Sequence, residues 1–181
     1  MNQLETNRLI LRPFISDDAA DLYEYLSDKT VLKYEPCEIF TFDACKAEAI
    51  SRSQNKAFWA VCLKDTGKLI GNIYFSRIDP LDLLTYEIGY VFNATYQKQG
   101  FAAEAATAIL NYAFNALHAR RVIAMCNPKN VNSWRLLERL HMRREGHLIQ
   151  NIYFNKDEEG HPIWQDTYEY GILAQEWLSH F

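Results

Sequence analysis

Residues 96–104 form a loop of small and polar residues between a strand-like apolar stretch and the most periodic part of the chain. A strand that passes through such a loop into a helix brings unpaired backbone N–H groups to the positive end of the helix dipole, where anions bind. Gly100 and Ala102 leave room for a phosphate beside the main chain. The loop lacks the Gly-Lys-Ser/Thr of a P-loop and the Gly-x-Gly-x-x-Gly of dinucleotide sites. Taken alone, it is typical both of a phosphate site and of an ordinary turn.

The segments around this loop predict the elements that position it. Apolar residues at helical spacing from Ala102 to Leu117 predict a helix with one buried face, and Glu104 in its first turn is interpreted as a partner of the helix dipole. Further helices are predicted after the caps Ser16 and Thr41, over 132–140 and over 174–178, the first with Ala19, Leu22, Tyr23 and Leu26 facing inward. Strands are predicted over 9–14, 58–63, 69–75, 85–92, 121–126, 144–154 and 164–173. This order predicts a mixed α/β (α+β) fold of one sheet flanked by helices.

The composition limits the class of protein. The chain has 181 residues, 49% of them hydrophobic, and a net charge of −4, which predicts one domain over residues 1–181 that needs no disulfide or metal. The acidic balance argues against a protein that coats nucleic acid, and no apolar run reaches the roughly 20 residues that cross a bilayer. No signal peptide is evident, so we expect a cytoplasmic protein with reduced thiols. The four cysteines lack metal-binding spacing: Cys37, Cys45, Cys62 and Cys126.

Five motifs, in order along the chain, resemble one family. Gln97-x-x-Gly100-x-Ala102 is similar to the Q/R-x-x-G-x-G/A signature of the GCN5-related N-acetyltransferase (GNAT) superfamily. Four other segments resemble the branch that includes RimJ and RimL: residues 6–14 (T-x-R-L-x-L-R-P), 87–90 with 100–105 (E-I-G-Y and G-Y-A-T-E-A), 127–133 (N-P-x-N-x-x-S) and 176–177 (E-W). The resemblance covers nearly the whole chain.

This resemblance implies a fold and a binding site. The fold is a GNAT fold, a single splayed, mostly antiparallel sheet of about seven strands flanked by helices, with the co-substrate acetyl-CoA wedged between the fourth and fifth strands. The backbone of Tyr90, Val91 and Phe92 would pair with the pantetheine arm, Asn130 would hydrogen-bond it, and Ser133 would face the thioester. The pyrophosphate would be wrapped by Gln97, Lys98, Gln99, Gly100, Phe101, Ala102 and Ala103.

Acetyl transfer to an amine also requires a base and an acid. A lysine-like ammonium, with a pKa of about 10.4, must lose a proton before attack, and the departing thiolate must gain one. Glu87, near the start of the strand that would bind the co-substrate, is the candidate base, although alternation along the strand leaves it facing either the cleft or solvent. The tyrosine that many family members use as acid is replaced by Leu137, and the Gly-Phe pair after it by His141-Met142. Ser133 is therefore the candidate acid, with helix capping as its alternative role.

Three functions follow from these patterns. The first is an acetyl-CoA-dependent N-acetyltransferase whose primary amine acceptor is a protein N-terminal α-amino group, including that of a ribosomal protein, or a small-molecule amine. The missing tyrosine keeps open a non-catalytic acyl-CoA-binding sensor or partner module, and the loop alone keeps open a generic phosphate- or nucleotide-binding protein. We expect no nucleic-acid partner, no membrane and no metal. Aromatic residues on the terminal strands are consistent with a homodimer.

Overall fold

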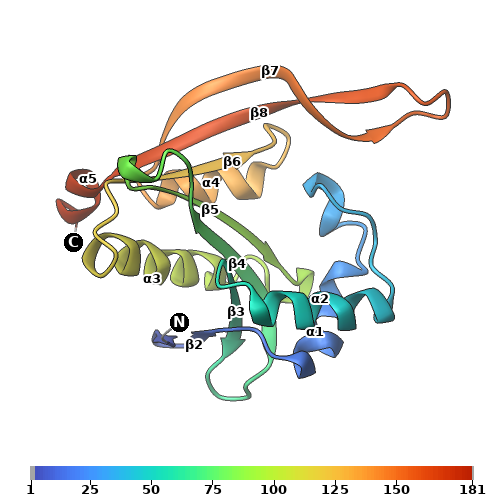
Figure 1. Ribbon diagram of the computed structural model, residues 1–181, viewed down its shortest axis with the longest axis horizontal. Helices are drawn as coiled ribbons and strands as arrows, with labels where there is room; N and C mark the ends of the chain where they lie inside the picture. The colour runs from blue at the N-terminus through green and yellow to red at the C-terminus, as the bar shows by residue number, and fades with distance from the viewer. Residues whose placement is uncertain (1–2, 181) are drawn as a thin grey trace.

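A single mixed sheet forms the centre of the computed structural model, which describes residues 3–180 (Figure 1). Its eight strands run in the order β1-β2-β3-β4-β5-β6-β8-β7, and every neighbouring pair is antiparallel except β5 and β6. The strands are β1 (Leu4–Glu5), β2 (Leu9–Arg12), β3 (Phe58–Leu63), β4 (Leu69–Arg77), β5 (Thr85–Phe92), β6 (Arg121–Cys126), β7 (Arg143–Lys156) and β8 (Pro162–Leu173). The mostly antiparallel sheet is confirmed, and the short strand β1 adds one to the expected count of about seven.

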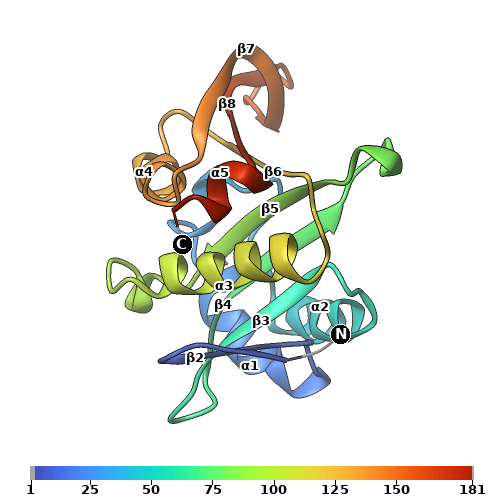
Figure 2. The ribbon, with the colours of Figure 1, turned by 90° about the vertical axis from the view of Figure 1, so that its left-hand side faces the viewer.

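Helices cover both faces of this sheet (Figures 1 and 2). One face packs against α1 (Ala19–Leu26) and α2 (Phe42–Gln54), and the other against α3 (Phe101–Asn115), α4 (Val131–Arg139) and α5 (Ala174–Leu178). Four short 3-10 turns complete the part of the chain that the structure describes: η1 (Ser16–Asp18), η2 (Leu32–Tyr34), η3 (Leu81–Leu83) and η4 (Ala94–Tyr96). Each face therefore has its own apolar core, and the sheet separates the two.

Most predicted elements are confirmed, and their ends follow from local chemistry. The Thr41 hydroxyl accepts a hydrogen bond from the Ala44 N–H at 3.2 Å, so it caps α2 as expected. Helix α3 buries the predicted stripe but ends at Asn115, so Leu117 lies beyond it. The polar segment before Pro162 turns between β7 and β8, which project together past the rest of the sheet (Figure 1).

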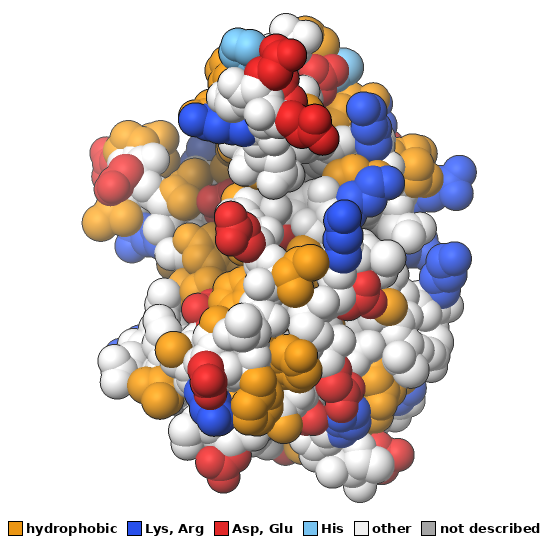
Figure 3. All heavy atoms as spheres, turned by 90° about the vertical axis from the view of Figure 1, so that its right-hand side faces the viewer, with side chains coloured by type: hydrophobic (Ala, Val, Ile, Leu, Met, Phe, Trp, Pro, Cys, Tyr) orange, Lys and Arg blue, Asp and Glu red, His pale blue; other side chains and the backbone are white. Residues whose placement is uncertain are grey.

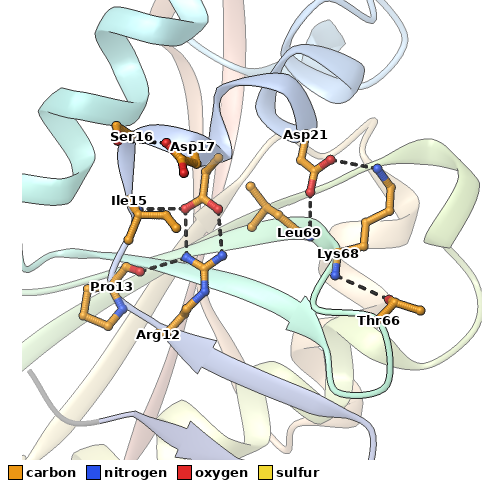
Figure 4. A network of polar contacts seen from close by, with 10 residues as sticks. Arg12, Pro13, Ile15, Ser16, Asp17, Asp21, Thr66, Lys68 and Leu69 are labelled. Atoms are coloured by element: carbon orange, nitrogen blue, oxygen red, sulfur yellow. Dashed lines mark hydrogen bonds and ion pairs between the residues drawn. The ribbon is translucent and has the colours of Figure 1, made fainter.

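The start of the first helix differs from the prediction. Ser16 does not cap it; the Asp18 carboxylate accepts the Ile15 N–H at 2.9 Å and is held by Arg12 through two bonds of 2.7 and 2.8 Å (Figure 4). A partly buried arginine–carboxylate pair thus replaces the serine cap. The intervening 3-10 turn also changes which residues face inward, because it advances the chain by a different angle per residue. Tyr23 is 40% exposed, and Tyr25 is buried and donates its hydroxyl to Asn72 Oδ1 at 2.9 Å.

The sheet opens between β5 and β6. These parallel strands pair at only three positions, Thr85 with Arg121, Tyr86 with Val122 and Glu87 with Ile123. Beyond Glu87 the strands diverge, although β5 continues to Phe92 and β6 to Cys126. If β1 is not counted, β5 and β6 are the fourth and fifth strands of the sheet, and the opening was expected between these two.

Two further features bear on the expectations above. Within residues 3–180, none of the helices combines the length and the apolar content needed to cross a membrane. The four cysteine thiols are free, and among the described residues no cluster of three or more histidine, cysteine or acidic side chains is placed to hold a metal ion.

Candidate active site

The loop before α3 presents a row of unpaired backbone donors. Lys98 and Gly100 both adopt left-handed backbone conformations, with φ of 61° and 86°, which turn the chain sharply into the helix. The first helical bond joins the Glu104 N–H to the Gly100 carbonyl at 3.0 Å. The N–H groups of residues 98–103 donate to no acceptor within residues 3–180. This concave set of N–H groups at a helix N-terminus is a binding site for an anion such as a diphosphate.

Two glutamines keep the loop in this shape. Gln97 donates its side-chain amide to the Phe92 carbonyl at 2.9 Å, and its backbone N–H bonds to the Ala94 carbonyl. Gln99 donates its side-chain amide to the Thr95 carbonyl at 2.9 Å. Of the seven residues expected to surround the pyrophosphate, Gln97 therefore supports the loop, and the free N–H groups begin at Lys98.

The end of the loop that leads into α3 is hydrogen-bonded to residues near the N-terminus. The Glu104 carboxylate accepts hydrogen bonds from the Thr6 hydroxyl at 2.6 Å and from the Arg8 backbone and Nε at 2.8 and 2.7 Å. Arg8 also donates to the Gln99 carbonyl at 3.1 Å. Burial alone would raise the pKa of Glu104, but the bonds from Thr6 and Arg8 outweigh it and lower that pKa below its ordinary value. Two motifs that are distant in the sequence thus meet, and Glu104 does more than balance the helix dipole.

The open edge of β5 carries the groups expected to pair with a pantetheine arm. The Asn93 N–H bonds to the Ile70 carbonyl and the Ile78 N–H to the Thr85 carbonyl, so β5 residues of odd number direct their backbone groups to β4. Val91 is one of these and pairs with Asn72. Tyr90 and Phe92 have the opposite parity, so their backbone groups point toward the opening, where the Phe92 carbonyl already accepts Gln97.

A pair of hydroxyl groups lies across the opening. The Tyr90 hydroxyl donates to the Ser133 carbonyl at 3.1 Å and lies 3.1 Å from Ser133 Oγ. Ser133 is in the first turn of α4, where Asn130 is the N-cap and accepts the Ser133 N–H through Oδ1 at 3.3 Å. The Asn130 side-chain NH₂ bonds to no residue in 3–180. Asn130 and Ser133 therefore lie together as expected, and the side chain of Tyr90 joins them.

Burial controls the protonation of these groups. It raises the pKa of Tyr90 far above its ordinary value, and the negative charge of Glu35 adds to this shift. Burial also raises the pKa of Cys126 to about 11, with a contact from the Ser133 hydroxyl acting against it. Tyr90 and Cys126 are consequently protonated at neutral pH, and Tyr90 is a hydrogen-bond donor beside Ser133. The sequence predicted a role only for the backbone of Tyr90; the signal available for its side chain was strand alternation, which places it on the same face of β5 as Ile88 and Phe92.

The positions that depart from the family pattern have structural roles. Leu137 is 1% exposed and lies in the core, so it supplies no proton. His141 adopts φ of 59° after the end of α4, where its N–H bonds to the Glu138 carbonyl and the Met142 N–H bonds to the Leu137 carbonyl. This is the Schellman pattern, in which glycine is the usual residue at the left-handed position. His141 thus terminates the helix.

Glu87 lies apart from the hydroxyl pair. It forms the last pair of β5 with β6, at the point where the strands diverge, and its side chain is on the opposite face of β5 from Tyr90. The side chain is partly buried and makes no hydrogen bond or ion pair with a described residue; burial raises its pKa above the ordinary value. A carboxylate of this kind can accept a proton at the apex of the opening.

Comparisons with known proteins agree with this geometry. A model of the acetyltransferase (GNAT) domain matches residues 8–143. The chain is 41% identical over 175 residues to the uncharacterized N-acetyltransferase YnaD of Bacillus subtilis, which covers 96% of this chain and 98% of that protein. It is 28% identical to the ribosomal protein uS5-alanine N-acetyltransferase of Escherichia coli, over 97% of this chain and 92% of that protein.

The fold is also found among solved structures. The crystal structure of an acetyltransferase of the GNAT family from Bacillus anthracis matches with a TM-score of 0.87 and 35% sequence identity, and the match covers 97% of this chain and 100% of that one. The chain therefore belongs to the GNAT acetyltransferase family and is an N-acetyltransferase. The resemblance to the RimJ/RimL-like branch is confirmed, and a generic phosphate-binding protein is no longer a competing interpretation.

Proposed function

We propose that residues 1–181 act as one domain that transfers an acetyl group from acetyl-CoA to a primary amine by direct attack of the amine on the thioester. The observation that carries this proposal is the opening between β5 and β6, which has unpaired N–H groups at one end and the Tyr90–Ser133 hydroxyl pair in its wall. An anion site and a proton donor on the same opening match a substrate with a diphosphate at one end and a thioester at the other.

The residues present fit acetyl-CoA. The N–H groups of residues 98–103, in the loop before α3, would hold its diphosphate, and the Gly100 backbone allows close approach because it has no side chain. The backbone of Tyr90 and Phe92 and the free NH₂ of Asn130 would hold the amide-rich pantetheine arm. Acetyl-CoA supplies the acetyl group as an activated thioester, and every other function falls to the chain.

The proton transfers are assigned to three side chains. Glu87 accepts the proton that the acceptor ammonium must lose before its nitrogen can attack, directly or through water. Ser133 donates a proton to the departing sulfur as the C–S bond breaks, and Tyr90, 3.1 Å from Ser133 Oγ, passes one to Ser133; the second proton that the attacking nitrogen loses on forming the amide replaces it. Leu137 cannot take this role because it is buried and apolar. The net result is one amide formed, one thiol released and one proton transferred from the amine toward solvent.

Release of free thiol from acetyl-CoA, measured across a panel of primary amines, tests the proposal. We expect turnover with at least one amine, a fall in kcat of about 100-fold for Ser133→Ala, and an acetyl-CoA Kd that stays close to that of the unmodified protein. Glu87→Gln should lower kcat/KM to a similar degree. The pKa of Glu87 is raised, so the unmodified enzyme should gain rate as pH rises through that pKa, and the variant should lose this dependence. Glu38→Gln, an exposed carboxylate elsewhere, is the matched control.

The alternative is a non-catalytic acyl-CoA-binding sensor or partner module, and the buried Leu137 at the usual position of the acid is the observation in its favour. Tight acetyl-CoA binding with no thiol release for any amine would support it. Thiol release that survives in both Ser133→Ala and Glu87→Gln would instead remove our assignment of the residues.

For the acceptor, we propose either a protein N-terminal α-amino group or a small-molecule amine. The E. coli relative is named for the alanine of ribosomal protein uS5, which makes a peptide with a free N-terminal alanine the first acceptor to assay.

The β7–β8 hairpin exposes large apolar side chains, with Ile149 64% and Trp164 51% exposed. We propose that this hairpin contacts a second copy of the chain. Light scattering tests this proposal: the unmodified protein should have the mass of a dimer, and Trp164→Lys should have half that mass.

A further inference from the structure

Glu35 is a partly buried carboxylate without a partner. It follows η2 in the connection between α1 and α2; its backbone N–H bonds to the Leu32 carbonyl, but its carboxylate makes no hydrogen bond or ion pair with any residue in 3–180. Removing a carboxylate from water without a compensating bond costs free energy. Burial accordingly raises the pKa of Glu35 to about 7, and the positive charge of Arg52 offsets this only in part.

Arg52 does not serve as the missing partner. Its Nε donates to Glu48 Oε1 at 2.7 Å, and its guanidinium lies 4.6 Å from the centre of the Phe58 ring. Arg52 is therefore a buried residue of α2 that is held by Glu48, and its positive charge acts on Glu35 without a direct bond. The other titratable groups that act in this region are Cys37 in the same connection and Tyr90 on β5.

The backbone holds Glu35 at the opening. The Tyr34 hydroxyl donates to the Lys129 carbonyl at 3.1 Å, which ties the α1–α2 connection to the segment that leads into α4. Glu35 is extended, with φ of −94° and ψ of 150°, because Pro36 follows it. Its charge acts on Tyr90, whose hydroxyl lies beside Ser133. The side of the molecule that carries this connection and the hairpin end is hollowed, and hydrophobic side chains gather in the hollow (Figure 3).

We infer that Glu35 is the acceptor-binding residue, whose carboxylate receives the ammonium group of a cationic amine and orients it toward the Ser133 side of the opening. This inference rests on the proposed acetyl transfer and adds the charge state of the acceptor to it. An ammonium supplies the hydrogen bonds that the chain does not provide, and it replaces the water lost when the carboxylate was buried. The neighbouring Glu38 is exposed and has no such role.

The test compares Glu35→Gln with the matched control Glu38→Gln, which removes the same charge three residues away. Binding of two probes to protein saturated with CoA is measured by calorimetry at pH 8: spermidine, and a short peptide with a free N-terminal alanine. The same peptide with an acetylated N-terminus serves as the uncharged comparison. For whichever amine binds, we expect Glu35→Gln to weaken binding about 10-fold or more, and Glu38→Gln to leave it within 2-fold.

Steady-state kinetics separate binding from structural damage. Glu35→Gln should raise KM for the amine by the same factor while KM for acetyl-CoA is maintained and the thermal midpoint does not fall, since glutamine has the same shape. In the unmodified enzyme the amine KM should fall as pH rises through about 7, as Glu35 ionises, and the variant should lack this change. Equal amine affinity in Glu35→Gln and the unmodified protein, or amine binding by neither, would overturn the inference. Amine binding that depends on Glu35 without thiol release would uphold it and overturn the proposed acetyl transfer.

Discussion

The two ends of the opening are built in opposite ways. The loop before α3 is held by a dense set of internal bonds, with Glu104 accepting from Thr6 and Arg8 and both loop glutamines bonded to carbonyls. Within residues 3–180, the connection between α1 and α2 has one side-chain hydrogen bond to the α4 side, from the Tyr34 hydroxyl to the Lys129 carbonyl, and the Glu35 carboxylate has no partner. Under the proposed function, a co-substrate with a constant diphosphate would meet a pre-organised backbone, whereas the acceptor end would keep a polar group for its ligand to pair with.

If this contrast is correct, removing a carboxylate should have opposite effects at the two ends. At the loop, Glu104→Ala deletes the acceptor for Thr6 and Arg8 and should lower the free energy of unfolding by about 2–3 kcal/mol. Because the pKa of Glu104 is lowered, its contribution is present above the pKa of the unfolded carboxyl and lost as pH falls through the lower folded value. Urea unfolding at pH 7 and pH 4 measures this, with Glu38→Ala as control. An unchanged stability at pH 7 would show that these bonds are not what holds the loop.

At the acceptor end, Glu35→Gln should raise stability. The pKa of Glu35 is raised from 4.5 to about 7, so its favourable contribution is present below pH 4.5 and lost as pH rises through 7. The variant should match the unmodified protein near pH 4.5 and exceed it by on the order of 2 kcal/mol at pH 8. Urea unfolding across this range provides the measurement. A variant less stable than the unmodified protein at pH 8 would mean that Glu35 has an internal partner.

The smallest change in stability is expected from removing the hydrogen bond between the Tyr34 hydroxyl and the Lys129 carbonyl at the acceptor end. Tyr34→Phe removes one partly exposed hydrogen bond to the Lys129 carbonyl, which is worth about 1 kcal/mol or less. Because this bond places Glu35 at the opening, we expect the amine KM to rise a few-fold while the acetyl-CoA Kd is unchanged. Tyr23→Phe, which alters an exposed tyrosine on α1, is the control. A change in acetyl-CoA affinity would contradict the independence of the two ends.

Periodic and turn-based features were accessible from the sequence. The apolar stripe of α3, the Thr41 cap and the loop at Gly100 depend on residues close together in the chain, and the structure confirms them. The serine cap expected at Ser16 is wrong because Arg12 and Asp18 form a partly buried pair that no local pattern shows.

The site was accessible only in part. The motif resemblance predicted the neighbourhood of Asn130 and Ser133, which the structure brings together. It did not reveal the role of the Tyr90 hydroxyl, because Tyr90 and Ser133 are 43 residues apart in the sequence, or the Arg8–Glu104 pair, whose members are 96 residues apart. It also did not reveal that the Glu35 carboxylate lacks a partner among residues 3–180. Contacts of this kind are set by tertiary packing, which periodicity does not encode.

The three-pair junction between β5 and β6 also bears on how the chain folds. Strands β3, β4 and β5 are joined by consecutive antiparallel pairings, and β7 and β8 form their own hairpin, so each group can assemble from contacts that are local in sequence. The parallel junction requires α3 to be in place first, because α3 connects the two strands. Its formation closes a long loop and gains few backbone hydrogen bonds in return, so this folding step is slow. We therefore expect the junction to form late in folding and its amides to be the first in the central sheet to exchange with solvent.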